Sequence, residues 1–182
     1  MIEIRSYTPI LAAELNQLTG PFSCSDTYRV RYHDSETGSG FELEPMALEV
    51  PHVHHYTHID DEWVRTYLAP ADFSLGAFEG EQLVGVLIAE KRTWNDSLWV
   101  WEYHVAAERR GQGIGRMLME HAVLQAKAAG LRVIICETQN SNSSAIKAYR
   151  KLGFRPEGID ISYYTNHDYP DGDVAVFMKL RL

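Results

Sequence analysis

The sequence is poor in cysteine and in basic residues, and it has no long apolar run. Its two cysteines, Cys24 and Cys136, are too few for a disulfide framework and form no metal-ligand pair. No apolar run approaches the length of a membrane span, and the alternating, charged start of the chain does not resemble a signal peptide. We therefore expect reduced thiols, a cytoplasmic location and no membrane partner.

Acidic residues outnumber basic ones. The 182 residues include 17 Lys and Arg against 25 Asp and Glu, which gives a formal net charge of −8. An acidic surface repels the phosphates of nucleic acids and attracts cations, so we expect no nucleic-acid partner and favour a cationic ligand. The sequence contains no repeats, linkers or low-complexity tracts, and we expect residues 1–182 to form a single domain.

The hydrophobic pattern predicts a mixed α/β sheet. Strands are expected over residues 2–7, 73–78, 83–91, 97–105, 131–138, 154–164 and 174–180, and helices over residues 9–18, 63–68, 114–129 and 143–152. Residues 21–59 interrupt this order, and their alternation around a Gly-rich turn predicts an inserted hairpin, with strands at 27–33 and 41–44 and an extended tail. The strand–helix–strand unit over residues 97–138 is expected to be a right-handed parallel crossover.

A glycine-rich loop joins the expected strand over residues 97–105 to the helix that follows it. The loop reads Arg-Arg-Gly-Gln-Gly-Ile-Gly-Arg over residues 109–116. Glycine lets the backbone approach a phosphate, and the N–H groups at a helix N-terminus attract anions. The spacing is not that of a dinucleotide fingerprint, and the Gly-Lys-Ser/Thr ending of a P-loop is missing. The alternative is a glycine-rich turn that binds no ligand.

The loop does match the pattern Gln/Arg-x-x-Gly-x-Gly/Ala, filled here by Arg110, Gly113 and Gly115. This pattern resembles the acetyl-CoA signature of the GNAT superfamily of N-acetyltransferases. Residues 142–154 are similar to that superfamily's segment Asn-x-x-Ala-x-x-Phe/Tyr-Tyr-x-Lys-x-Gly-Phe, with Ala148 where an aromatic residue is common. Within the superfamily the chain most resembles the streptothricin acetyltransferases, through Trp94-Asn95, residues 110–115, Glu137-Thr138-Gln139 and residues 174–181.

The resemblance implies a fold and a co-substrate. The fold would be a twisted mixed sheet with helices on both faces, whose central parallel strands splay around acetyl-CoA. The main chain at the end of the central strand would pair with the pantetheine arm, and the glycine-rich loop would hold the pyrophosphate. The residues so implied are Tyr103, His104, Val105, Arg110, Gly111, Gln112, Gly113, Ile114, Gly115 and Arg116, and Asn142 would also help to hold acetyl-CoA.

Two residues are candidates for moving protons. Tyr149 lies seven residues after Asn142, two helical turns further along the same face, and a phenol can protonate a departing thiolate. We therefore take Tyr149 as the candidate general acid, the alternative being an aromatic residue of the core. Glu102, in the central strand, is the candidate base for the amine proton, and Glu137 is the second candidate. Either glutamate could instead be an ordinary, satisfied residue of the sheet.

The chemistry expected is direct transfer. No Cys or Ser occupies a convincing position for a nucleophile, so we expect the amine to attack the thioester directly, with a backbone N–H near Val105 polarising its carbonyl. The function predicted is acetyl-CoA-dependent N-acetylation of a primary amine on a small cationic acceptor, such as streptothricin, which would confer antibiotic resistance. Two alternatives stay open: a protein, peptide or polyamine acceptor, and a non-catalytic sensor that binds acetyl-CoA.

No metal is expected. His52, His54, His55 and His58 form a histidine-rich stretch, but Pro51 argues against a helix there and no Cys or well-spaced acidic residue completes a site.

The oligomeric state stays open. Trp94 and Trp99, taken as exposed aromatic residues, are candidates for pocket walls or for the seam of a homodimer.

Overall fold

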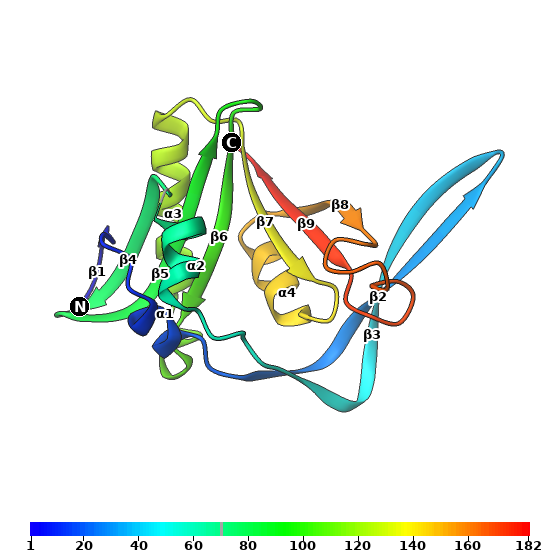
Figure 1. Ribbon diagram of the computed structural model, residues 1–182, viewed down its shortest axis with the longest axis horizontal. Coiled ribbons are helices and arrows are strands. Elements are labelled where there is room, and N and C mark those ends of the chain that lie inside the picture. The colour runs from blue at the N-terminus through cyan, green and yellow to red at the C-terminus, as the bar shows by residue number, and fades with distance from the viewer. Residues whose placement is uncertain (70) are drawn as a thin grey trace. The chain divides into compact units, whose positions relative to one another are not determined.

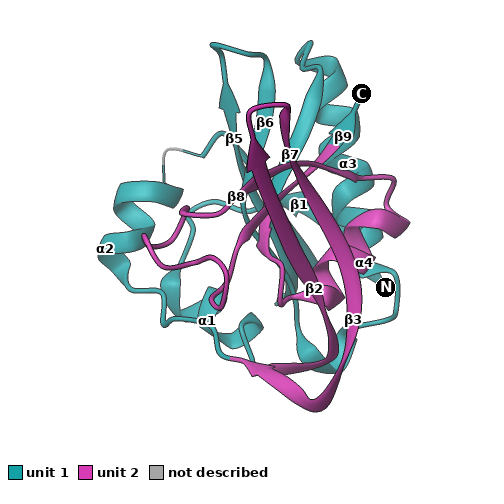
Figure 2. Ribbon diagram, turned by 90° about the vertical axis from the view of Figure 1, so that its right-hand side faces the viewer, with its two compact units in different colours: residues 1–20, 55–136, 180–182 teal, residues 21–54, 137–179 magenta. Residues whose placement is uncertain are grey.

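The computed structural model describes residues 1–69 and 71–182 (Figure 1). The chain divides into two compact units, coloured separately in Figure 2. Unit 1 comprises residues 1–20, 55–136 and 180–182, and unit 2 comprises residues 21–54 and 137–179. Within the described residues, no helix is both long enough and apolar enough to cross a membrane.

Unit 1 is built on a mixed sheet. Its strands are neighbours in the order β1-β4-β5-β6-β7, with bounds β1 (Ile2–Ser6), β4 (Phe73–Glu79), β5 (Gln82–Arg92), β6 (Ser97–Val105) and β7 (Val133–Gln139), the last of which continues into unit 2. The pairs among the first four strands are antiparallel. Strands β6 and β7 are parallel, with Ser97–Val100 opposite Val133–Cys136, and helix α3 (Ile114–Ala128) connects them. The predicted mixed sheet and its parallel strand–helix–strand unit are confirmed.

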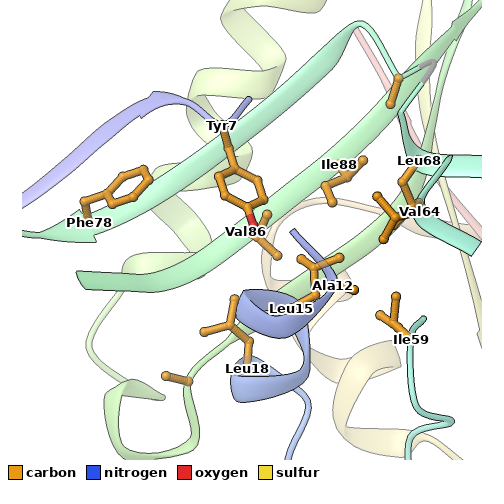
Figure 3. Close-up of a cluster of buried hydrophobic side chains, with 12 residues drawn as sticks. Tyr7, Ala12, Leu15, Leu18, Ile59, Val64, Leu68, Phe78, Val86 and Ile88 are labelled. Atoms are coloured by element: carbon orange, nitrogen blue, oxygen red, sulfur yellow. The ribbon is translucent and has the colours of Figure 1, made fainter. Parts of the chain in front are cut away.

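Helices cover both faces of this sheet. On one face lie α1 (Ala12–Leu18), α2 (Asp61–Trp63) and the π-helical turn η1 (Val64–Leu68), whose apolar side chains pack with Val86 and Ile88 of β5 (Figure 3). On the other face Gly85 of β5 approaches Ile114 and Leu118 of α3. Neighbouring residues of a strand point to opposite faces, which is why β5 serves both helical layers. Burying a leucine or isoleucine side chain fully contributes about 1.5–3 kcal/mol to the stability of the folded state.

Strand β6 contains a bulge. Ile88 of β5 lies opposite Glu102 and Ala89 lies opposite Val100, so Trp101 is an extra residue on β6. A bulge bends its strand and turns the side chain of the extra residue. Trp101 packs at the edge of the core that Val86 and Ile88 form with the α1 and α2 layer.

Unit 2 contains a long hairpin, the strand β8 (Arg155–Asp160), helix α4 (Ser143–Lys151) and most of the strand β9 (Ala175–Arg181), whose last two residues belong to unit 1. The hairpin consists of β2 (Phe22–Ser35) and β3 (Gly38–His54), and it is much longer than the strands expected within residues 21–59. The expected extended tail is part of β3. The prolines of β3 argued against a continuous strand. A strand that is paired along one edge can accommodate proline at positions where the missing N–H would point away from the partner strand.

Asn140, at the end of β7, joins the parts of unit 2. Its backbone accepts a hydrogen bond from Tyr28 N (3.0 Å), and its side-chain amide donates to Tyr28 O (2.7 Å). Its side-chain oxygen also accepts a hydrogen bond from Val174 N (2.7 Å).

Strand β8 ends at Asp160, four residues before the expected end, because Asp160 accepts a hydrogen bond from Ser162 N (3.0 Å) and starts a turn.

Candidate functional site

The glycine-rich loop leaves β6 through a short 3₁₀ turn, η2 (Ala107–Arg109), and enters α3 at its first turn. Gly111 has φ +76° and Gly113 has φ +86°, a conformation that side chains with a Cβ adopt at a cost. Nothing lies within 4 Å of where a Cβ at either glycine would be. The first N–H groups of an α-helix have no acceptor within the helix. The loop therefore offers open backbone at the positive end of α3, which suits a phosphate.

Gly115 is approached closely by a side chain of β6. A Cβ at this position would lie 2.8 Å from the hydroxyl of Tyr103, on β6. Tyr103 and Gly115, both implied to be cofactor residues, are thus brought together where the strand end meets the first turn of α3. Burial raises the pKa of the Tyr103 hydroxyl, so the group stays protonated at neutral pH.

Three arginines flank the loop, and each contacts a hydrogen-bond acceptor or a carboxylate. Arg110 donates from Nε to the carbonyl of Val105 (3.1 Å), which holds the loop against the end of β6. Arg109 forms an ion pair with Glu79 of β4, and Arg116 lies 3.7 Å from Glu120 one turn further along α3. The positive charge of Arg109 and Arg116 is therefore partly neutralised by carboxylates of unit 1. A guanidinium has five N–H donors in a planar arrangement, which suits the oxygens of a pyrophosphate.

Gln112 and Ile114 complete the loop. Gln112 donates from its side chain to the carbonyl of Glu108 (3.2 Å), and Ile114 is buried against the sheet. These contacts fix the loop conformation and leave Gly111 and Gly113 exposed. The residues present therefore fit the pyrophosphate of acetyl-CoA, the group that the sequence motif implies.

Glu102 and His104 form a pair that the sequence analysis missed. His104 Nε2 lies 2.5 Å from Glu102 Oε2, and the exposed fractions of the two side chains are 8% and 17%. The ring of Tyr56 packs at right angles against the imidazole, with 5.0 Å between ring centres. Residues two apart on a strand share a face, so the spacing of Glu102 and His104 in the sequence could have predicted that the two side chains meet. A carboxylate held by a histidine can accept a proton and pass it on.

Asn142 and Tyr149 lie on α4 of unit 2. The side-chain oxygen of Asn142 accepts a hydrogen bond from Ala145 N (3.1 Å), so Asn142 caps the N-terminus of α4. Tyr149 is 8% exposed, and its ring packs against Phe154 at 5.5 Å between centres. Both the role of a core aromatic residue and that of a proton donor are compatible with these contacts. The amide nitrogen of Asn142 is the part of that side chain that suits an acceptor on a ligand.

Glu137 also has a partner in unit 2. The hydroxyl of Tyr164 donates to its carboxylate. Burial raises the pKa of Glu137, and the hydrogen bond from Tyr164 opposes this shift. Glu137 is thus a carboxyl group with a perturbed pKa at the carboxyl end of β7, as a candidate base would require.

Part of the histidine-rich stretch lies on the hairpin. His54 stacks on Phe22 with 4.7 Å between ring centres, and its Nε2 lies 3.2 Å from the carbonyl of Ser141. His52 contacts His54 edge-on. The stretch is part of strand β3 up to His54, which agrees with the expectation from Pro51 that it is not a helix. Across residues 1–69 and 71–182, no three His, Cys, Asp or Glu side chains are grouped so as to hold a metal ion.

The two tryptophans named as candidate surface residues differ. Trp94 is 81% exposed, in the turn between β5 and β6. Trp99 is buried at 7% exposure, and the guanidinium of Arg92 lies 3.9 Å above its ring. The expectation that Trp99 is exposed was wrong, because on β6 it faces inward and is covered by Arg92.

Comparison with known proteins identifies relatives of the whole chain. The sequence pattern of the acetyltransferase (GNAT) family matches residues 39–154. A streptothricin acetyltransferase from Streptomyces lavendulae is 31% identical over 189 residues, which cover 98% of this chain and 94% of that protein. A [ribosomal protein bS18]-alanine N-acetyltransferase from Escherichia coli (strain K12) is 32% identical over 87 residues, 48% of this chain and 59% of that protein.

Solved structures share the fold over the full length. The crystal structure of a nourseothricin acetyltransferase is 30% identical, with a TM-score of 0.79, and covers 99% of this chain and 98% of its own. A structure from Bacillus anthracis, solved with acetyl coenzyme A, has a TM-score of 0.76 at 22% identity and covers both chains completely. The mixed α/β architecture is therefore one that acetyltransferases adopt.

Proposed function

Because the chain belongs to the GNAT family of N-acetyltransferases, we propose that it transfers the acetyl group of acetyl-CoA to a primary amine of a small cationic acceptor of the streptothricin class. The observation that carries the proposal is the loop between β6 and α3. It combines two glycines with positive φ, open backbone at a helix N-terminus and the Arg110 guanidinium. These features suit the pyrophosphate of acetyl-CoA.

The residues of the loop and of the strand end would hold acetyl-CoA. Tyr103, His104 and Val105 would present their main chain to the pantetheine arm. Gly111, Gln112, Gly113, Ile114, Gly115 and Arg116 would surround the pyrophosphate with Arg110. In unit 2, the side-chain amide of Asn142 would contribute a further hydrogen bond.

The reaction forms a C–N bond and breaks a C–S bond. The amine nitrogen attacks the thioester carbonyl carbon, and a backbone N–H near Val105 stabilises the charge that develops on the oxygen. Glu102 accepts the proton that the amine must lose, and His104 orients the carboxylate. Tyr149 gives a proton to the departing thiolate. The products are an N-acetyl amine, the free thiol of coenzyme A and the proton that a cationic amine gives up. Glu102 releases its proton to water and Tyr149 takes one back from water, which restores both groups.

The choice of acceptor rests on charge and on relatives. The formal net charge of −8 favours a cationic acceptor. The relative that is similar over nearly the whole chain is a streptothricin acetyltransferase, and the solved neighbour with 30% identity is a nourseothricin acetyltransferase. Acetylation removes the positive charge of an amine. We propose that this loss of charge is the basis of antibiotic resistance and that the reaction takes place in the cytoplasm.

A protein or peptide amine is the second candidate acceptor. It is favoured by the similarity of about half of the chain to the bS18-alanine N-acetyltransferase of Escherichia coli. That similarity covers 48% of this chain, against 98% for the streptothricin acetyltransferase, so we place the protein or peptide acceptor second.

The test measures thiol release from acetyl-CoA with a panel of amines. The panel contains streptothricin, spermidine and a peptide with an N-terminal alanine, and acetyl-CoA binding is measured separately by calorimetry. Saturable release with streptothricin supports the proposal. Release with the peptide or spermidine alone would replace the acceptor, whereas binding of acetyl-CoA with no release from any amine would indicate a sensor.

A further inference from the structure

Three aromatic side chains form a row on unit 1, which we call the aromatic row: Trp63, Tyr67 and Trp101. The ring centres of Trp63 and Tyr67 are 4.3 Å apart, and those of Tyr67 and Trp101 are 6.2 Å apart. Trp63 is 41% exposed and Tyr67 is 43% exposed. Large aromatic rings contribute to a core only when they are buried, so folding alone does not explain two such rings at the surface.

The row is held in place. Asp60 accepts a hydrogen bond from Trp63 N (2.7 Å), which fixes the start of the helix. Trp63 and Tyr67 are one turn apart on this helix, so their side chains lie on the same face. Trp101 donates from its indole nitrogen to Glu90 (2.8 Å) and packs against the core. The rings are therefore positioned before any ligand arrives, which lowers the entropic cost of binding.

The charges around the row favour a cation. Asp60, Asp61 and Glu62 precede or adjoin Trp63 in the sequence, and Glu90 contacts Trp101. Two cations are near: the exposed Arg65 lies between Trp63 and Tyr67 on the helix, and Arg92 lies 3.9 Å above Trp99, 5.9 Å from the Trp101 ring and 4.0 Å from Glu90. The four carboxylates outnumber these two cations. The electron-rich faces of tryptophan and tyrosine attract ammonium and guanidinium groups. Carboxylates beside aromatic rings strengthen this preference through their negative potential.

The row leads to the proposed base. Trp101 is the extra residue of the β6 bulge, and Glu102 follows it directly. Glu102 and His104 lie opposite Ile88 and Val86, which face the layer of α1 and α2. Trp63 and Tyr67 belong to that same layer. The aromatic row and the Glu102–His104 pair thus lie on one face of the sheet.

We propose that the aromatic row binds a second cationic group of the acceptor while the reacting amine lies at Glu102. The proposal rests on the proposed function, and it specifies the acceptor class as an amine that carries at least two positive charges. Trp63 and Tyr67 supply the ring faces that contact the second cation, and Trp101 closes the row toward the base. No group in this row takes part in bond making or breaking.

The experiment separates cation binding from turnover. Dissociation constants of streptothricin, 1,5-diaminopentane and 1-aminopentane are measured by titration calorimetry without acetyl-CoA, and thiol release is measured in parallel. We expect Trp63→Ala and Tyr67→Ala each to weaken binding of the first two ligands about threefold to tenfold. Binding of 1-aminopentane, which carries one charge, should be unchanged.

Two control variants make the result specific. Trp63→Phe combined with Tyr67→Phe keeps both rings, and we expect affinities within about twofold of the wild type. Trp94→Ala removes an exposed tryptophan from the turn between β5 and β6 and should have no effect. Thermal melting of each variant identifies any that fails to fold, in which case the double phenylalanine variant and Tyr67→Ala carry the comparison.

Several outcomes would overturn the proposal. They are alanine variants that bind streptothricin like the wild type, an equal loss for 1-aminopentane, an equal loss in Trp94→Ala, and a wild-type protein that binds none of the cationic amines. Failure of the proposed function looks different: the calorimetric pattern holds, but no amine releases thiol from acetyl-CoA.

Discussion

The imidazole of His104 and the carboxylate of Glu102 lie 2.5 Å apart on one face of β6. Neither residue is exposed, and Val86 and Ile88 lie opposite them on β5. Two polar side chains at the edge of an apolar core are costly unless they satisfy each other. This relationship gives the proposed base a fixed orientation, and it makes His104 a positioning residue with a testable role.

Replacing Glu102 removes the proposed base. We expect Glu102→Gln to lower kcat about 100-fold to 10,000-fold, because general base catalysis contributes factors of this size. Binding of acetyl-CoA, measured by calorimetry, should be unchanged. The matched control is Glu137→Gln, which removes the other candidate carboxylate. A larger loss of kcat in Glu137→Gln than in Glu102→Gln would assign the base to Glu137 instead.

His104 can be tested through two substitutions. His104→Phe keeps a ring against Tyr56 but removes the hydrogen bond to Glu102, and we expect kcat to fall about tenfold. His104→Asn keeps a hydrogen-bond donor and should recover part of that loss. The KM for acetyl-CoA should not change in either variant. An equal loss in both variants, accompanied by a lower melting temperature, would assign His104 a purely structural role.

Tyr149→Phe separates a proton donor from a core residue. The substitution keeps the ring that packs against Phe154, so stability should change by less than about 1 kcal/mol. We expect kcat to fall about 100-fold because the thiolate loses its proton donor. The measurements are thiol release and urea unfolding of the same protein. Full activity in Tyr149→Phe would leave the hydroxyl without a catalytic role.

The sequence predicted the mixed sheet and the loop because local pattern determines both. Apolar alternation marked β4, β5 and β6, and the glycines at 111 and 113 marked a turn that the structure shows with positive φ. The length of the hairpin was not predicted, because Pro45 and Pro51 normally indicate the end of a strand. In a two-stranded hairpin each strand is paired along one edge, and proline is tolerated where its missing N–H would point to the unpaired edge.

The site could be predicted only where a motif spans a continuous stretch. Arg110 and Gly115 belong to such a stretch. The contacts of Trp101 with Tyr67, and of Arg109 with Glu79, join residues far apart in the chain, and no local pattern encodes them. The Glu102–His104 pair is the exception, since two-residue spacing on a strand would have placed both side chains on one face.

Gly115 and Tyr103 provide a test of the loop geometry. A Cβ in Gly115→Ala would lie 2.8 Å from the Tyr103 hydroxyl oxygen but 3.5 Å from the ring carbon that carries it. We expect this variant to raise the KM for acetyl-CoA about tenfold, since the buried Tyr103 side chain or the first turn of α3 must shift. Adding Tyr103→Phe removes the close contact and should restore most of the affinity. If Tyr103→Phe alone raises the KM equally, the hydroxyl itself binds acetyl-CoA.

The hairpin of unit 2 is tied to α4 by an ion pair whose effect on stability should depend on pH. Asp26 on β2 accepts hydrogen bonds from Lys147 and from Ser143 Oγ (2.9 Å), and these bonds hold the pKa of Asp26 below its usual value. The pKa is lower in the folded protein than in the unfolded chain. The stabilisation is therefore complete above the ordinary carboxyl pKa of about 4 and is lost as the pH falls through the folded value.

In urea unfolding between about pH 6 and pH 3, the free energy of unfolding should decline less steeply with falling pH for Asp26→Asn than for the wild type. Arg31→Gln, which breaks the exposed pair with Glu44 on the same hairpin, is the matched control and should follow the wild-type curve. Identical curves for Asp26→Asn and the wild type would contradict the role of this pair.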